Sequence, residues 1–187
     1  MGAVMLRSLV AATVVLVAVS GCVPIEAQPG SDRATTVRAI GDSIMVGAEA
    51  YLADLVPTME IDAQSGRPFS AGIDVLAARS ATGDVPDVLV FALGTNGGAS
   101  PSQIDAVMDL ASDVDEVIFV NVRVPRDWET ATNAALADVV GRYPNATLVD
   151  WNRESAGQNR LFRSDGYHPN STGSELWANL IVIEIKN

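Results

Sequence analysis

From Thr36 onward, short apolar segments alternate with segments whose apolar residues recur at helical spacing. Segment 87–93 is a continuous apolar run bounded by Pro86 and Gly94, as expected of a strand buried on both faces. Strands alternating with helices pair in parallel through right-handed crossovers. The pattern predicts a flavodoxin-like three-layer α/β/α sandwich on a five-stranded parallel sheet. Its strands are predicted at 36–40, 59–63, 87–93, 116–122 and 146–151.

The helices between these strands are indicated by apolar spacing and by residues that start or stop helices. Gly72 is expected near the start of the helix that contains 73–79, and Pro101 at the first position of the next. A later helix repeats the spacing through Tyr143 and is stopped by Pro144. The first and last helices are predicted at 44–55 and 171–185.

The polar residues Ser43, Gly66 and Asn96 each follow a predicted strand by only a few positions. In open α/β sheets, sites lie beyond the carboxyl ends of the strands. We therefore expect these three residues to meet at one edge of the sheet.

The N-terminal segment is typical of an export signal. Arg7 gives a short positive region, and an apolar run at 9–19 has the length of a signal core rather than of a membrane-spanning helix. The run leads into Val-Ser-Gly-Cys at 19–22, which resembles the bacterial lipobox. The sequence predicts a signal peptide at 1–21, a tether at 22–35 and one domain at 36–187. Lipidation of Cys22 would anchor the domain outside the cytoplasm, whereas an ordinary secretory signal would release it.

Composition excludes some classes of function. The formal net charge of −11 argues against binding nucleic acid, which needs a basic face. Cys22 is the only cysteine, so no disulfide can form within the chain.

A single histidine, His168, lies in a polar loop three residues after Asp165. A serine hydroxyl becomes a strong nucleophile when a base removes its proton and a carboxylate orients that base. Asp165, His168 and Ser43 could form such a relay. A surface or helix-capping histidine is the ordinary alternative, and a metal site here would have to be rich in carboxylates. We predict no metal and no other cofactor.

Acyl transfer also needs donors aimed at the developing oxyanion. The glycine-rich loop at 94–98 carries the amide of Asn96, and Gly66 leaves a backbone N–H open to substrate. Taken singly, each could be a plain glycine turn of a sheet protein.

Together, these blocks occur in the order and rough spacing of the SGNH (GDSL-type) hydrolase superfamily, which the domain resembles throughout. The resemblance implies Ser43 as nucleophile, His168 as base and Asp165 as its partner. It also implies an oxyanion hole formed by the N–H groups of Ser43 and Gly66 and the side chain of Asn96.

A narrower resemblance is to the extracytoplasmic SGNH domains of peptidoglycan O-acetyltransferases. It rests on AIGDSIMVGA at 39–48, IDAQSGR at 61–67, LGTNG at 93–97 and NVRVPR at 121–126. Those domains are usually fused to a membrane acyltransferase, which this sequence does not show. The resemblance implies an exported serine esterase or O-acyltransferase acting on acylated cell-envelope carbohydrate, alone or with a separate membrane acyl donor. The alternative, an idle SGNH domain that binds carbohydrate or a partner, predicts the loss of a triad or oxyanion residue, and none is missing.

Four further residues in loops are candidates for contacts with substrate. Arginines could hold a polar acceptor and a tryptophan could stack on a sugar, although surface salt bridges and loop anchoring are equally compatible with the pattern. These residues are Arg67, Arg123, Arg126 and Trp128.

Overall fold

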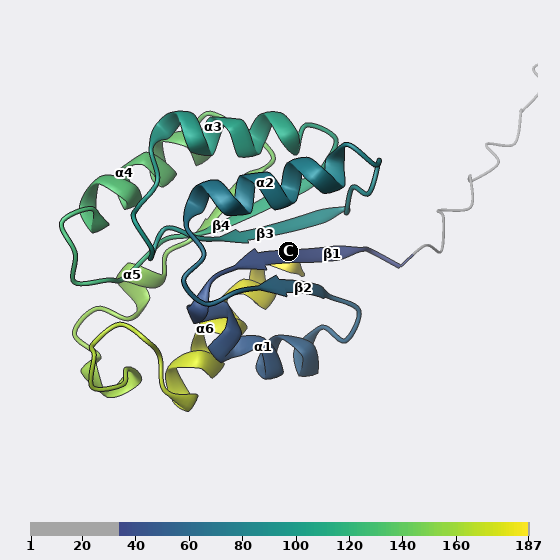
Figure 1. Ribbon diagram of the computed structural model, residues 1–187. Helices are drawn as coiled ribbons and strands as arrows, with labels where there is room; N and C mark the ends of the chain where they lie inside the picture. The colour runs from purple at the N-terminus through teal and green to yellow at the C-terminus, as the bar shows by residue number, and fades with distance from the viewer. Residues whose placement is uncertain (1–33, 187) are drawn as a thin grey trace, which may run out of the picture. The chain divides into compact units, whose positions relative to one another are not determined.

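The computed structural model describes residues 34–186, which form alternating strands and helices (Figure 1). The strands are β1 (Val37–Gly41), β2 (Glu60–Ala63), β3 (Val88–Ala92), β4 (Glu116–Val120) and β5 (Ala146–Val149). The longer helices are α1 (Ser43–Leu55), α2 (Phe69–Ser80), α3 (Pro101–Leu110), α4 (Glu129–Val140) and α6 (Ser171–Ile185). Two short helical turns, α5 (Trp151–Glu154) and η1 (Asn159–Leu161), lie between β5 and α6.

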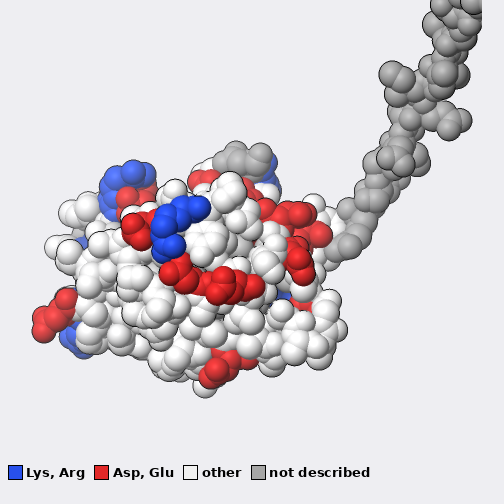
Figure 2. Space-filling model, turned by 90° about the horizontal axis from the view of Figure 1, so that it is seen from above, with Lys and Arg blue, Asp and Glu red and all other residues white. Residues whose placement is uncertain are grey.

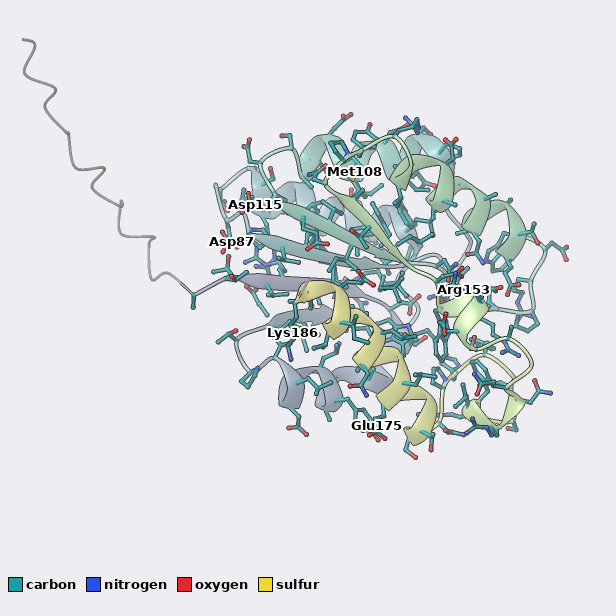
Figure 3. All side chains as sticks on the ribbon, turned by 180° about the vertical axis from the view of Figure 1, so that it is seen from behind. Asp87, Met108, Asp115, Arg153, Glu175 and Lys186 are labelled. Atoms are coloured by element: carbon teal, nitrogen blue, oxygen red, sulfur yellow. The ribbon has the colours of Figure 1, made fainter. Side chains whose placement is uncertain are left out.

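The five strands form one parallel sheet in the order β2-β1-β3-β4-β5, which confirms the predicted flavodoxin-like architecture. From β1 the chain adds β2 on one side, and β3, β4 and β5 are then added on the other side. The direction in which strands are added therefore reverses between β1 and β3. In open α/β sheets this switch point is the usual place for a ligand, outside the carboxyl ends of the strands. Asp87 and Asp115, which precede β3 and β4, lie at the opposite end of the sheet from Arg153 in α5 (Figure 3).

Helices cover both faces of the sheet. α1 and α6 pack together on one face, and α2, α3 and α4 cover the other (Figure 1). Each layer has its own apolar core, one around Met45, Val90 and Trp177 and the other around Phe69, Phe91 and Phe119. Because both faces are covered, every residue of the central strands β1 and β3 is buried, and β3 is continuously apolar.

Most strand ends differ from the sequence prediction by one or two residues, and three boundaries change the assignment of a named residue. Gly72 lies inside α2, which already begins at Phe69 after the N-cap Pro68. α4 ends at Val140, before Tyr143, and β5 ends at Val149, so that Trp151 starts α5. Asp150 causes the last change, because its side chain accepts a hydrogen bond from the N–H of Arg153 and caps a helical turn.

The predicted signal peptide and nearly all of the predicted tether lie outside the described residues. Within 34–186, no helix is long and apolar enough to cross a membrane. On the face shown in Figure 2, acidic side chains dominate the charged surface and basic ones are scattered among them.

Gly72 marks the closest approach of α2 to the sheet. A Cβ at this position would overlap Leu93 Cδ1 and lie 2.9 Å from Phe91 Cζ. We predict that Gly72→Ala lowers the free energy of unfolding by about 1–3 kcal/mol, because overpacking outweighs the better helix propensity of alanine. Urea unfolding measures this change.

Gly141→Ala is the matched control. Gly141 has φ −64°, and the nearest atom to its added Cβ is 3.4 Å away. This variant should be neutral or more stable by up to about 1 kcal/mol. Equal stability of Gly72→Ala and the wild type would contradict the close packing of α2.

Candidate active site

The turn from β1 into α1 positions Ser43. Asp42 is the N-cap of α1, and its Oδ1 accepts a hydrogen bond from the N–H of Ile44 at 2.9 Å. Ser43 is the first residue of the helix, where backbone N–H groups are free and the helix dipole favours negative charge. β1 fixes the backbone before Ser43, and the Asp42 cap fixes the backbone after it.

The structure brings Ser43, His168 and Asp165 into one hydrogen-bonded chain. Ser43 Oγ lies 2.9 Å from His168 Nε2, and His168 Nδ1 lies 2.9 Å from Asp165 Oδ2. When Nδ1–H donates to Asp165, Nε2 is left with a lone pair that accepts the serine hydroxyl. This is the arrangement that activates a serine nucleophile.

The loop that carries His168 is held by the chain segment before it. Phe162 forms an antiparallel bridge with Pro169, and the N–H of Arg163 donates to the carbonyl of His168 at 2.8 Å. Asn170 then caps α6 by accepting from the N–H of Gly173. The base is therefore fixed by backbone pairing on one side and by a helix N-terminus on the other.

Asp165 is held in its ionised form. Its Oδ1 accepts hydrogen bonds from the N–H groups of Tyr167 and His168, and its Oδ2 faces the imidazole. Desolvation acts to raise the pKa of Asp165, but these hydrogen bonds outweigh it and lower the pKa to about 2. The carboxylate of Asp165 is thus charged at neutral pH.

The three predicted oxyanion donors lie around the same turn. Gly66 has φ +76°, in the left-handed region that favours glycine, and the space where its Cβ would be is open. Within the described part of the chain, no hydrogen bond uses the N–H of Ser43 or of Gly66. The side-chain amide of Asn96 lies 3.2 Å from Asp42 Oδ2 and 3.3 Å from the carbonyl oxygen of Arg67.

Asp42 was not predicted as a site residue, although an aspartate directly before a helix is a typical N-cap signal. It is 1% exposed and connects the nucleophile turn to Asn96. Burial raises the pKa of Asp42, and hydrogen bonds from Ile44 and Thr95 oppose the increase.

Arg67 was predicted as a possible substrate contact, but its side chain is buried and does not reach a surface that a substrate could contact. The residue is 7% exposed. Its guanidinium donates to the carbonyl oxygens of Gly41 and Asp62 and to Asp62 Oδ1. A guanidinium committed to these partners is not available to a sugar or an anion.

The side chain of Arg123 also has hydrogen-bond partners within the protein. Its guanidinium donates to Ser155 O and Asn159 Oδ1 and lies 4.2 Å from the ring centroid of Phe162. It still borders a polar recess of about 340 Å³ that reaches Gly166 in the loop between Asp165 and His168.

Neither Trp128 nor Arg126 is hydrogen-bonded to Ser43, His168 or Asp165. Trp128 lines a largely apolar groove of about 630 Å³ together with Gly97 and Gly98, directly after Asn96. Its indole N–H is buried and has no hydrogen-bond partner among the described residues. Arg126 is exposed and donates to the carbonyl oxygen of Pro125.

The assembled groups suit acyl transfer. A serine hydrogen-bonded to a histidine, a carboxylate on the other nitrogen of that histidine and the unused N–H groups of Ser43 and Gly66 are parts that this chemistry needs. Within residues 34–186, no three His, Cys, Asp or Glu side chains are grouped as a metal site.

Comparisons with known proteins agree with this geometry. No protein-family model matches the chain. Peptidoglycan O-acetyltransferase OatA of Listeria monocytogenes is 33% identical over 148 residues, which are 79% of this chain and 24% of that protein. The chain thus spans about a quarter of the length of this curated relative.

Solved structures share the fold. The C-terminal catalytic domain of OatA from Streptococcus pneumoniae matches with a TM-score of 0.73 at 20% identity, over 82% of this chain and 93% of that one. A member of the lipolytic protein G-D-S-L family from Veillonella parvula matches with a TM-score of 0.65 at 17% identity, over 82% of this chain and 100% of that one. The sheet order and these solved structures together show that the chain has the fold of G-D-S-L-type hydrolases, and its sequence is similar to that of a peptidoglycan O-acetyltransferase.

Proposed function

We propose that this protein is an exported serine esterase or O-acyltransferase that acts on O-acetyl groups of cell-envelope carbohydrate through an acyl-Ser43 intermediate. The observation that carries the proposal is the relay of two 2.9 Å contacts from Ser43 through His168 to Asp165. The relationship to a peptidoglycan O-acetyltransferase supports acetyl groups and cell-wall sugars as the substrate class.

In the first half-reaction, Ser43 Oγ attacks the carbonyl carbon of the ester while His168 Nε2 takes the hydroxyl proton. The tetrahedral oxyanion accepts hydrogen bonds from the N–H groups of Ser43 and Gly66, and from the amide of Asn96 once one of its two hydrogens leaves Asp42 Oδ2 or Arg67 O. As the intermediate collapses, the bond to the leaving alcohol breaks and His168 returns the proton to that oxygen. The acetyl group stays on Ser43.

In the second half-reaction, water or a sugar hydroxyl gives its proton to His168 Nε2 and attacks the carbonyl carbon of the acyl-serine. The bond from that carbon to Ser43 Oγ then breaks, and His168 returns the proton to Ser43 Oγ, which restores the free enzyme. Water completes an esterase cycle, and a sugar hydroxyl completes a transferase cycle. In the transferase case, a separate membrane protein could supply the acetyl group that is transferred to Ser43. We further propose that Arg123 and Trp128, which border the recess and the groove beside the site, contact the acceptor.

The direction of the reaction is decided by following the acetyl group. Purified protein is given an activated acetate ester as donor together with a cell-wall oligosaccharide, and mass spectrometry counts acetyl groups on the sugar. Acetyl-sugar that depends on Ser43 indicates transfer, and free acetate alone indicates hydrolysis.

Ser43→Ala and His168→Ala should each reduce hydrolysis of a small activated acetate ester to near background, because either change removes the activated nucleophile. A serine-directed fluorophosphonate should label the wild type at Ser43 and leave Ser43→Ala unlabelled. Ser70→Ala, which changes an exposed serine of α2, is the control and should behave as the wild type. Wild-type activity no greater than that of Ser43→Ala would refute the proposed chemistry, and an unlabelled wild type would point to an idle binding domain.

Asp165→Asn should lower kcat/KM by about 10²–10⁴-fold, because the imidazole loses the carboxylate that orients it. It should also change how stability depends on pH. Folding lowers the pKa of Asp165 from 3.8 to about 2, so its charge stabilises the folded protein above about pH 4 and this contribution is lost as the pH falls to about 2. The stability difference between wild type and variant, measured by denaturant unfolding, should shrink over that interval. A difference that stays constant would contradict the lowered pKa.

We also propose that residues 1–21 are a signal peptide, that lipidation of Cys22 anchors the protein to the outer face of the cell membrane, and that 22–35 is a tether for the domain. Cys22→Ser should move the protein from the membrane fraction to the soluble extracytoplasmic fraction. Fractionation and immunoblotting measure the shift. Continued membrane association of Cys22→Ser would argue against the lipid anchor.

A further inference from the structure

Arg67 is a buried cation next to the nucleophile turn. It is 7% exposed and lies in the turn between β2 and α2. Its Nη1 donates to Gly41 O at 3.2 Å and to Asp62 O at 2.6 Å, and its Nη2 donates to Asp62 Oδ1 at 2.6 Å. One guanidinium therefore joins the end of β1 to the end of β2.

Stability alone does not explain this arrangement. Burying an arginine carries a large desolvation cost, and a buried ion pair is weak support for stability compared with apolar packing. β1 and β2 are already joined by the ladder that pairs Arg38 with Glu60 through Gly41 with Ala63. What the guanidinium adds is a fixed position for the turn that follows β2.

That turn holds the proposed oxyanion donors. The N–H of Arg67 donates to Gln64 O at 3.2 Å, which closes a turn around Gly66, and the N–H of Gln64 donates to Gly41 O at 3.1 Å. The carbonyl oxygen of Arg67 in turn accepts from the amide of Asn96 at 3.3 Å. The side chain of Arg67 thus holds the Gly66 turn against Gly41, two residues before Ser43, and its backbone holds Asn96.

We propose that Arg67 is a positioning residue that aligns the Gly66 N–H and the Asn96 amide with the N–H of Ser43. The inference rests on the proposed acyl-transfer function. Arg67 itself touches no reacting atom. Oxyanion donors act only within about 2.7–3.1 Å of the developing charge, so a small displacement of the turn weakens two donors together.

The geometry requires arginine rather than any cation. The planar fork directs one nitrogen at two carbonyl oxygens and the other at a carboxylate. A lysine has one nitrogen at the end of a flexible chain and cannot keep all three contacts.

Arg67→Lys and Arg67→Met, made in the full chain, test the proposal with an activated acetate ester. Both should lower kcat by about 10–100-fold and change KM by less than about 3-fold, because the donors bind the transition state more strongly than the ester. If Arg67→Met fails to fold, the lysine variant gives the measurement. A folded Arg67→Lys with wild-type kcat would overturn the inference.

Arg79→Met is the matched control. Arg79 also pairs with Asp62, at 3.8 Å, and with Glu60 and Asp84, but it makes no contact with Gly41 or with the Gly66 turn. Removing this cation should reduce stability and leave kcat at the wild-type value. A loss of kcat equal to that of Arg67→Met would show that the ion pairs at Asp62, and not the position of the turn, control the rate.

A double-mutant cycle with Asn96→Ala separates positioning from general damage to the fold. If Arg67 acts through the oxyanion hole, Arg67→Lys should cost less in the Asn96→Ala background than in the wild type. Equal costs in both backgrounds would overturn the inference. An inactive wild type would instead refute the proposed function, so the two failures are distinguishable.

Discussion

The geometry of the site depends on two hydrogen bonds that the buried carboxylate of Asp42 accepts. One oxygen accepts from the N–H of Ile44 and caps α1, and the other accepts from the amide of Asn96. Because Ser43 follows β1 and Asn96 follows β3, a single side chain connects the two strands at the switch point of the sheet. The cost of burying this charge is offset by its hydrogen bonds and by the N-terminal end of a helix dipole. The turn that carries Ser43 and the amide of Asn96 are therefore positioned by the same group.

His168, the proposed general base, is held by different elements. The loop with His168 pairs with residues 161–163 and leads into α6, which packs on α1. Gly173 permits this approach, because a Cβ there would overlap the carbonyl oxygen of Leu161. The position of Ser43 is thus set by the carboxyl end of β1, whereas the position of His168 is set by the layer formed by α1 and α6. Their one direct contact in the relay is the 2.9 Å approach of Ser43 Oγ to His168 Nε2.

The sequence allowed the sheet and the triad to be predicted because both depend on local or unambiguous signals. Continuous apolar runs mark buried parallel strands, and a single histidine leaves one choice of base. The environment of Arg67 could not be predicted, since its carbonyl partner Gly41 lies 26 residues away in the sequence. A basic residue after a glycine is usually solvated, and only tertiary contacts show that this one is buried. The packing role of Gly72 could not be predicted for a similar reason, because only the approach of α2 to Leu93 and Phe91 shows that this position has no room for a methyl group.

The choice between hydrolysis and transfer depends on the acceptor and not on the triad. The side chains of His168 and Asp165 are 25% and 39% exposed, so water has access to the base. A sugar hydroxyl can compete only if it is held beside the acyl-serine, where effective molarities for well-oriented groups reach about 10⁵–10⁸ M. We propose that the groove at Gly97, Gly98 and Trp128, which begins one residue after Asn96, holds such an acceptor. On this proposal, transferase activity requires that the groove bind a sugar, whereas an esterase needs only the triad and the oxyanion hole.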